Sequence, residues 1–162
     1  MSIHTALVKT EEQKISLEKA KKFIYSDEQG AESIFVGRVR NENSGKKVTA
    51  VTYDAHDQAV LKTFESICKD AKNKFDNKAK IFLEHAQGYA PIGEISILIA
   101  VGTGHRDEAF KICRYVLEEV KHQSPIWKKE HYIDGKEEWL PGHSLRPKKE
   151  IKWSGDRLIQ QF

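Results

Sequence analysis

The chain has 162 residues, and its 39% hydrophobic and 31% charged residues indicate one soluble globular domain that can bury a core without disulfide bonds. The formal charge of +3 is too small to indicate a nucleic-acid partner by itself, and the longest apolar run, Ile95 to Val101, is too short to span a membrane. Because the N-terminus does not resemble a signal peptide and only two cysteines are present, we expect a cytoplasmic protein without a disulfide framework.

The first third of the chain is expected to form three strands and one short helix. Apolar residues predict a strand over 3–8, and Ser16 is a typical N-cap for the short helix that follows. A buried strand is expected over 31–39 and another over 48–55, with a turn signal at Ser44-Gly45 in the polar loop between them. These two strands are therefore candidates for a hairpin with a long loop.

The middle of the chain has the clearest helical periodicity. Apolar residues at helical spacing predict a long helix over 57–75, followed by a strand over 80–84 and a turn over 88–93. The segment 94–101 is apolar at nearly every position, which predicts a central strand covered on both faces. After a Gly-Thr-Gly break, a second long helix is expected over about 105–122.

The last part of the chain combines a hairpin with a basic tail. Loose alternation predicts a strand over 126–132, Asp134-Gly135 is a hairpin turn signal, and 138–140 is the expected return strand. This mixture of hairpins and helices indicates an α+β domain over 1–140, with a mixed or antiparallel sheet and helices on one side. Residues 141–162 form a Lys-rich C-terminal tail.

The start of the second long helix has two adjacent cationic residues, His105 and Arg106. Free N–H groups and the positive end of the helix dipole meet at such a point, so cations there are unfavourable unless an anion lies among them. The pattern therefore predicts an anion site. The alternative is two solvated surface residues.

A second cationic group lies where that helix ends and the next strand begins. Lys121 falls in the last helical turn, where a cation also suits the helix dipole. Lys128 and Lys129 are neighbours on the strand and point to opposite faces, so one of them can face a pocket while the other faces water. Lysines that share a pocket lower each other's pKa and can then transfer protons or act as nucleophiles. Glu130 lies on the face of Lys128 and is a candidate for orienting it.

A third cationic group, Arg38 and Arg40, ends the buried strand 31–39. Two arginines at this spacing can form a bidentate clamp for a phosphate or carboxylate. A pair of solvated edge-strand arginines is an equal alternative.

The cysteines, the histidines and the Gly-Thr-Gly segment do not indicate catalytic, metal or nucleotide sites. Cys68 and Cys113 fall on apolar helix faces, so we expect core residues rather than catalytic thiols. The seven histidines show no metal-ligand spacing, so we expect no metal site and no bound cofactor. Gly102-Thr-Gly104 is too short for a dinucleotide or P-loop motif.

The three cationic groups, in this order, resemble the signature segments of the molybdopterin synthase large (catalytic) subunit family. The resemblance covers about 31–139 and depends on three motifs: Gly37-Arg-Val-Arg-Asn-Glu-Asn-Ser-Gly45, Gly104-His-Arg106 followed by Ala109-Phe110, and Pro125-Ile-Trp-Lys-Lys-Glu130.

This resemblance implies an α/β-hammerhead type of α+β fold and a homodimer of large subunits. Each large subunit would bind a small ubiquitin-like sulfur carrier whose C-terminal Gly-Gly thiocarboxylate enters its pocket. Sulfur would pass to cyclic pyranopterin monophosphate to form the molybdopterin dithiolene. The resemblance implies Lys121 and Lys128 as catalytic residues. It implies these substrate-binding residues: Arg38, Val39, Arg40, His105, Arg106, Lys121, Lys128, Lys129 and Glu130.

The chain departs from the family pattern at two places. A basic residue that often follows the histidine at position 85 is replaced by Ala86, and the nearest matches to a later arginine are His143 and Arg146 in the tail. A different class of function, a non-catalytic module that binds a phosphorylated ligand or RNA, would use the same basic groups. Nucleic-acid readers interleave exposed aromatics with basic residues, whereas most aromatics here have core spacing.

Overall fold

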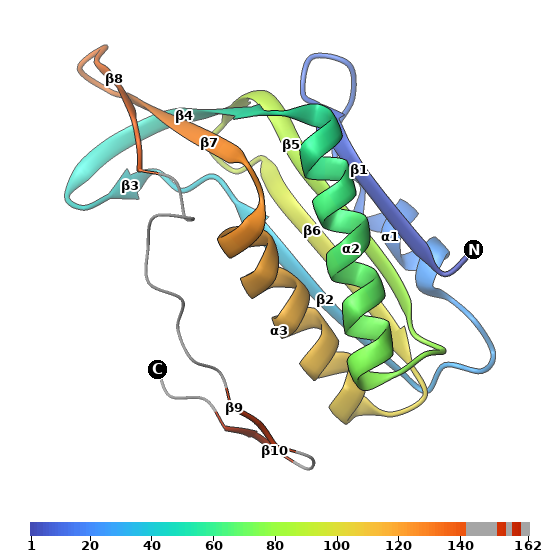
Figure 1. Ribbon diagram of the computed structural model, residues 1–162. Helices are drawn as coiled ribbons and strands as arrows, with labels where there is room; N and C mark the ends of the chain where they lie inside the picture. Colours follow the sequence, from blue (N-terminus) through green and yellow to red (C-terminus); the bar gives the residue numbers. More distant parts are fainter. Residues whose placement is uncertain (142–151, 155–156, 160–162) are drawn as a thin grey trace.

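The computed structural model describes residues 1–141, 152–154 and 157–159, and it confirms an α+β architecture (Figure 1). The C-terminal tail and its candidates His143 and Arg146 lie almost entirely outside the described residues. The elements are β1 (Ile3–Lys9), α1 (Leu17–Ile24), β2 (Ala31–Arg38), β3 (Glu42–Asn43), β4 (Lys46–Ala55), α2 (Asp57–Phe75), β5 (Lys80–Pro91), β6 (Ile95–Thr103), α3 (Arg106–Gln123), β7 (Ile126–Tyr132), β8 (Glu137–Trp139), β9 (Lys152–Ser154) and β10 (Arg157–Ile159).

One eight-stranded mixed sheet contains all strands from β1 to β8. Its main path runs β2-β6-β5-β4-β7-β8, with β1 parallel to β5 and β3 antiparallel to β4. The strand expected to be central, β6, lies between β2 and β5. Alternate residues of β6 enter two separate core clusters, which confirms that both of its faces are covered.

The helices cover both faces of the sheet, so the prediction of helices on one side was wrong. Helices α2 and α3 pack on the face that carries Ile97 and Ile99 of β6. Helix α1 packs on the opposite face against Leu98 and Ala100. The short helix could not be assigned to a face from periodicity alone, because an amphipathic pattern shows that a helix is covered and not which side of a sheet covers it.

Two predictions about strands were also wrong. The strands β2 and β4 do not form a hairpin with each other, because β2 pairs with β6, whereas β4 pairs with β5 and β7. Strand β5 does not stop at residue 84 but continues to Pro91. It passes through Gly88 at φ +105°, a conformation that glycine adopts without steric cost. The Ser44-Gly45 turn is confirmed, with both residues at positive φ between β3 and β4.

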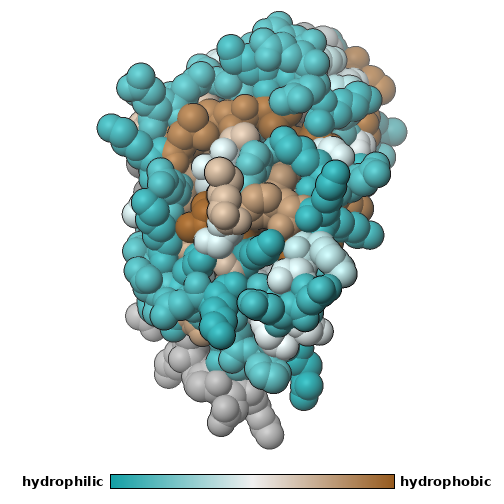
Figure 2. All heavy atoms as spheres, turned by 90° about the vertical axis from the view of Figure 1, so that its right-hand side faces the viewer, coloured by the Kyte–Doolittle hydropathy of each residue, from teal (hydrophilic) through white to brown (hydrophobic). Residues whose placement is uncertain are grey.

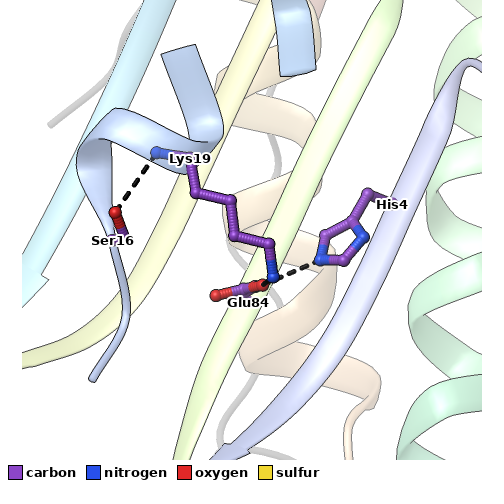
Figure 3. A network of polar contacts seen from close by, with 4 residues as sticks. All are labelled: His4, Ser16, Lys19 and Glu84. Carbon is purple, nitrogen blue, oxygen red and sulfur yellow. Dashed lines mark hydrogen bonds and ion pairs between the residues drawn. The ribbon is translucent and has the colours of Figure 1, made fainter. Parts of the chain in front are cut away.

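A buried carboxylate connects two strands of the main sheet with the helix α1 (Figure 3). Glu84 on β5 is 2% exposed and accepts hydrogen bonds from His4 Nε2 on β1 at 2.8 Å and from Lys19 Nζ on α1 at 3.1 Å. The hydroxyl of Ser16 accepts from the backbone N–H of Lys19 at 3.2 Å, which confirms the predicted N-cap. Because a buried charge is unfavourable without partners, these contacts tie β1 and α1 to β5.

Strands β4, β7 and β8 extend beyond the helices as an arm of the sheet (Figure 1). In this arm, Val51 and Tyr53 of β4 point into the second core cluster, and Lys128 and Glu130 of β7 are their register partners. We call this side of the arm the core side. The intervening residues lie on the other side, which we call the open side, where the register pairs Thr52 with Lys129.

The outer edge of β1 is the right-hand border of the main sheet (Figure 1). Among the described strands, β1 pairs with β5 only. Figure 2 views the molecule from this side and shows an apolar patch surrounded by hydrophilic side chains. In the described part of the chain, no helix combines the length and apolarity needed to cross a bilayer.

Candidate functional site

The arginine group, Arg38 and Arg40, lies at the end of β2, where the strand meets the β5–β6 turn. Arg38 is exposed, and its Nη1 donates to the carbonyl of Gly93 at 2.8 Å. Val39 is buried and bonds through its backbone to Gly93 and Glu94 on the same turn. These contacts hold the segment in place, and Arg40 follows it as an exposed side chain. Both arginines are therefore exposed side chains on a backbone that these contacts hold in place.

The second cationic group is divided between the end of α3 and the core side of β7. Lys121 is exposed in the last turn of α3, and a short connection leads from there to β7. Lys128 is half-buried and is the register partner of Tyr53 on β4. Glu130 is 1% exposed, and its carboxylate accepts a hydrogen bond from the Asn43 side-chain amide on β3. That Glu130 also orients Lys128 stays a prediction.

Lys129 lies on the open side of the arm, away from Lys128. Its Nζ lies 3.2 Å from Glu137 Oε2 on β8 and 5.3 Å from the centre of the Trp139 ring. The strong hydrogen bond and charge of Lys129 lower the pKa of Glu137. The two neighbouring lysines thus face opposite sides, as the strand alternation predicts.

The group formed by His105 and Arg106 lies at the opposite end of α3 from Lys121. His105 is the exposed N-cap and makes no side-chain capping bond, and Arg106 is the exposed first residue of the helix. The hydroxyl of Thr103 donates to the carbonyl of His105 at 2.6 Å and stiffens this turn. At 1.5 Å rise per residue, the 15 residues from Arg106 to Lys121 span roughly 22 Å along the helix. A single chain therefore does not bring His105 and Arg106 to the lysines.

Comparisons with known proteins identify the family of the chain. The family model described as MoaE protein matches residues 10–123. The chain belongs to the MoaE protein family. The molybdopterin synthase catalytic subunit of Synechococcus elongatus is 43% identical over 131 residues, which are 81% of this chain and 79% of that protein.

Solved structures share the fold. The crystal structure of molybdopterin synthase from Staphylococcus aureus has a TM-score of 0.77 at 28% identity, covering 87% of this chain and 98% of that chain. A chain from the complex of subunits 1 and 2 of the molybdopterin-converting factor from Helicobacter pylori has a TM-score of 0.65 at 23% identity, covering 85% of this chain and 88% of that chain. At this identity the second likeness concerns the fold alone.

Two residues that lie beside the candidate site were not singled out in the sequence. Asn43 was assigned to a loop, yet β3 places its amide against Glu130. Tyr53 is buried beside the core side of β7, and burial raises the pKa of its phenol. Tyr53 could have been found, because alternation in the predicted strand 48–55 puts it on the face of Val51. Asn43 had no such signal, because its position depends on a two-residue strand.

Several residues singled out for possible chemistry belong to the core. Cys68 and Cys113 are buried and unpaired with each other, as predicted. Burial raises the pKa of Cys68 to about 12 and also raises the pKa of Cys113, so both thiols stay protonated. Ala86 is buried in the second core cluster, so this position offers no charged group to the site. The described residues contain no group of three or more His, Cys, Asp or Glu side chains that could hold a metal.

Proposed function

We propose that this chain is the catalytic subunit of a molybdopterin synthase, a sulfurtransferase of molybdenum cofactor biosynthesis. The observation that carries the proposal is the family membership, which is supported by the presence of Lys121 in the last turn of α3 and Lys128 in the following strand β7. In this reaction, two sulfurs pass to cyclic pyranopterin monophosphate and form the dithiolene of molybdopterin. The two buried free thiols suit the reducing cytoplasm, where we place the reaction.

The sulfur donor in this proposal is a small ubiquitin-like carrier that ends in a Gly-Gly thiocarboxylate. Support comes from the Helicobacter pylori protein, which was solved as a complex of two subunits of the molybdopterin-converting factor. An extended Gly-Gly tail suits a narrow cleft, because glycine lets one backbone approach another closely. The carrier tail and the pterin phosphate are both anions, so the pocket needs cations to bring them together.

The basic groups divide this work. Arg38 and Arg40 would hold the phosphate or the pterin, since guanidinium groups form paired hydrogen bonds with phosphate oxygens. Lys121 and Lys128 would act on the acyl group of the docked carrier and move protons as the cyclic phosphate opens. Lys129 would contribute less to substrate binding than Lys128, because its side chain is engaged with Glu137 on the open side.

A homodimer would complete the pocket. His105 and Arg106 start α3, about 22 Å along the helix from Lys121 in the same chain. If both ends of α3 serve one substrate, a second copy must supply His105 and Arg106. The unpaired outer edge of β1 and the apolar patch in Figure 2 also provide surface that a second copy could cover. Sedimentation at micromolar concentration should give a dimer, and a monomer as the only species would contradict this part of the proposal.

The experiment that tests the function mixes the purified chain with a thiocarboxylated carrier and cyclic pyranopterin monophosphate. Molybdopterin formation is expected, and no product with a carrier known to be loaded would overturn the proposal. The matched control is the same carrier without its last two residues. The truncated carrier should dock weakly through its globular surface but support no turnover.

A further inference from the structure

A second group of polar residues lies on the open side of the arm, away from Lys128. The imidazole Nε2 of His131 lies 2.7 Å from the hydroxyl oxygen of Thr52. Its Nδ1 lies 3.2 Å from Glu137 Oε1. These three side chains come from the neighbouring strands β4, β7 and β8, where His131 pairs with Ala50 of β4 beside a register shift and with Glu137 of β8. A hydroxyl, an imidazole and a carboxylate therefore stand in one line across the sheet.

This order of groups is the one that activates a hydroxyl nucleophile. A carboxylate at Nδ1 favours the tautomer with the proton on Nδ1, which leaves the Nε2 lone pair directed at the hydroxyl. The imidazole ring is held by an edge-on contact with Tyr89, 5.3 Å between ring centres, and its side chain is 17% exposed. Glu137 is kept ionised by Lys129, which lowers its pKa. The His131 imidazole, which acts as the base, is thus oriented by Glu137 and by the Tyr89 ring.

The hydroxyl of this group lies at the wall of a cavity. A hollow of about 730 Å³ is lined by Thr52 together with the exposed rings of Tyr89 and Trp139. His131 adjoins this hollow, with its Nε2 at the Thr52 hydroxyl and its ring against Tyr89 of the wall. Lys129 is the register partner of Thr52, so a cation is close to any negative charge that develops on a group attached there. The aromatic walls suit a flat apolar group.

We propose that Thr52, His131 and Glu137 form a second acyl-transfer site, which hydrolyses small carboxylic esters with an aromatic leaving group. Thr52 Oγ1 attacks the ester carbonyl carbon while its proton passes to His131 Nε2. The bond from that carbon to the leaving oxygen breaks, and the leaving phenol takes the proton from Nε2. Water then attacks the acyl-threonine, again losing a proton to Nε2. The carboxylic acid departs, and Thr52 recovers its proton.

The test uses the full chain and 4-nitrophenyl acetate, following 4-nitrophenol release and the mass of the protein after a quench. The wild type should release the phenol faster than buffer and carry one acetyl group on the peptide that contains Thr52. Thr52→Ala should lose about a hundredfold or more of this rate, the usual scale for a positioned acid–base pair, and Thr52→Ser should retain it. The matched control is Thr49→Ala on the same strand, whose hydroxyl bonds the His131 carbonyl at 3.2 Å and not the ring.

The role of Glu137 as a positioning residue has its own readout. Glu137→Gln should lower kcat for the ester while KM stays within about twofold, because the cavity wall is unchanged. A structural role alone would change the melting temperature or KM instead. Acetylation at lysines or Tyr89 without Thr52, or equal rates in the wild type and Thr52→Ala, would overturn the proposal. None of these outcomes depends on the sulfur-transfer function, which uses the core side of the arm.

Discussion

Replacing Lys128 separates the two roles that a lysine in this pocket can have. Lys128→Ala removes both the charge and the amine, whereas Lys128→Arg keeps the charge. Arginine does not release its proton in the physiological range and cannot act as an amine nucleophile. If Lys128 transfers a proton or forms a covalent adduct, the arginine variant should be nearly as inactive as the alanine variant. If Lys128 only neutralises an anion, the arginine variant should keep most of the activity.

The expected size of the effect follows from where the two neighbouring lysines lie. A positioned acid–base group accelerates a reaction by about 10²- to 10⁴-fold, so Lys128→Ala should lose at least a hundredfold of turnover. Lys129→Ala is the control, because Lys129 has the same chemistry one residue away on the other side of β7. Its partner Glu137 is 51% exposed, and an exposed ion pair contributes at most about 1 kcal/mol to stability.

Single-turnover formation of molybdopterin with a loaded carrier measures the chemical step directly. The melting temperature, the oligomeric state and carrier binding are measured on the same samples, and all three should match the wild type in every variant. Wild-type rates in Lys128→Ala would remove this residue from the mechanism. A loss of turnover in Lys129→Ala as large as in Lys128→Ala would show that the two faces of β7 do not have separate roles.

Three further predictions concern the fold and its thiols. Phe64→Ala should cost about 3–5 kcal/mol and lower the melting temperature by roughly 6–20 °C, because Phe64 is fully buried, whereas Leu61→Ala on the same helix should cost far less. Gly88→Ala should cost about 1–3 kcal/mol in urea unfolding, since φ is +105° and the new Cβ would lie 2.7 Å from Thr10 Oγ1. Cys68, with its pKa raised to about 12, should resist iodoacetamide at mildly alkaline pH until the protein unfolds, and rapid alkylation of the native state would contradict its burial.

The elements with strong local periodicity were predictable from the sequence. Both long helices and β7 were assigned to within one or two residues. The helices have a regular apolar face over several turns, whereas β7 alternates only loosely and is bounded by Pro125 and the Asp134-Gly135 turn. The hairpin assigned to residues 31–55 was wrong for a different reason. Strand pairing is decided by contacts far apart in the sequence. Strand β6 follows β2 after the 56 residues 39–94, and it is the better partner for β2 because both of its faces are apolar.

Candidate residues for the site could be proposed from the sequence, whereas most contacts between side chains could not. The helix dipole argument identified His105 and Arg106, and strand alternation separated Lys128 from Lys129. The distance between the two ends of α3 was also available from the predicted helix length and already implied that one chain cannot join them. The groups on the open side of the arm could not be found in this way, because Thr52, His131 and Glu137 come together only through the registers of β4, β7 and β8.

Alternate side chains of β7 belong to two different proposed sites, one on each side of the arm. Lys128 and Glu130 point to the core side, and Lys129 and His131 point to the open side. A slip of one residue would exchange these two sets, because side chains in a strand repeat every two residues. Such a slip is opposed on both edges at once, since β7 is paired with β4 on one side and β8 on the other. Point substitutions at alternate residues can therefore separate the two activities, whereas any change of register would remove both together.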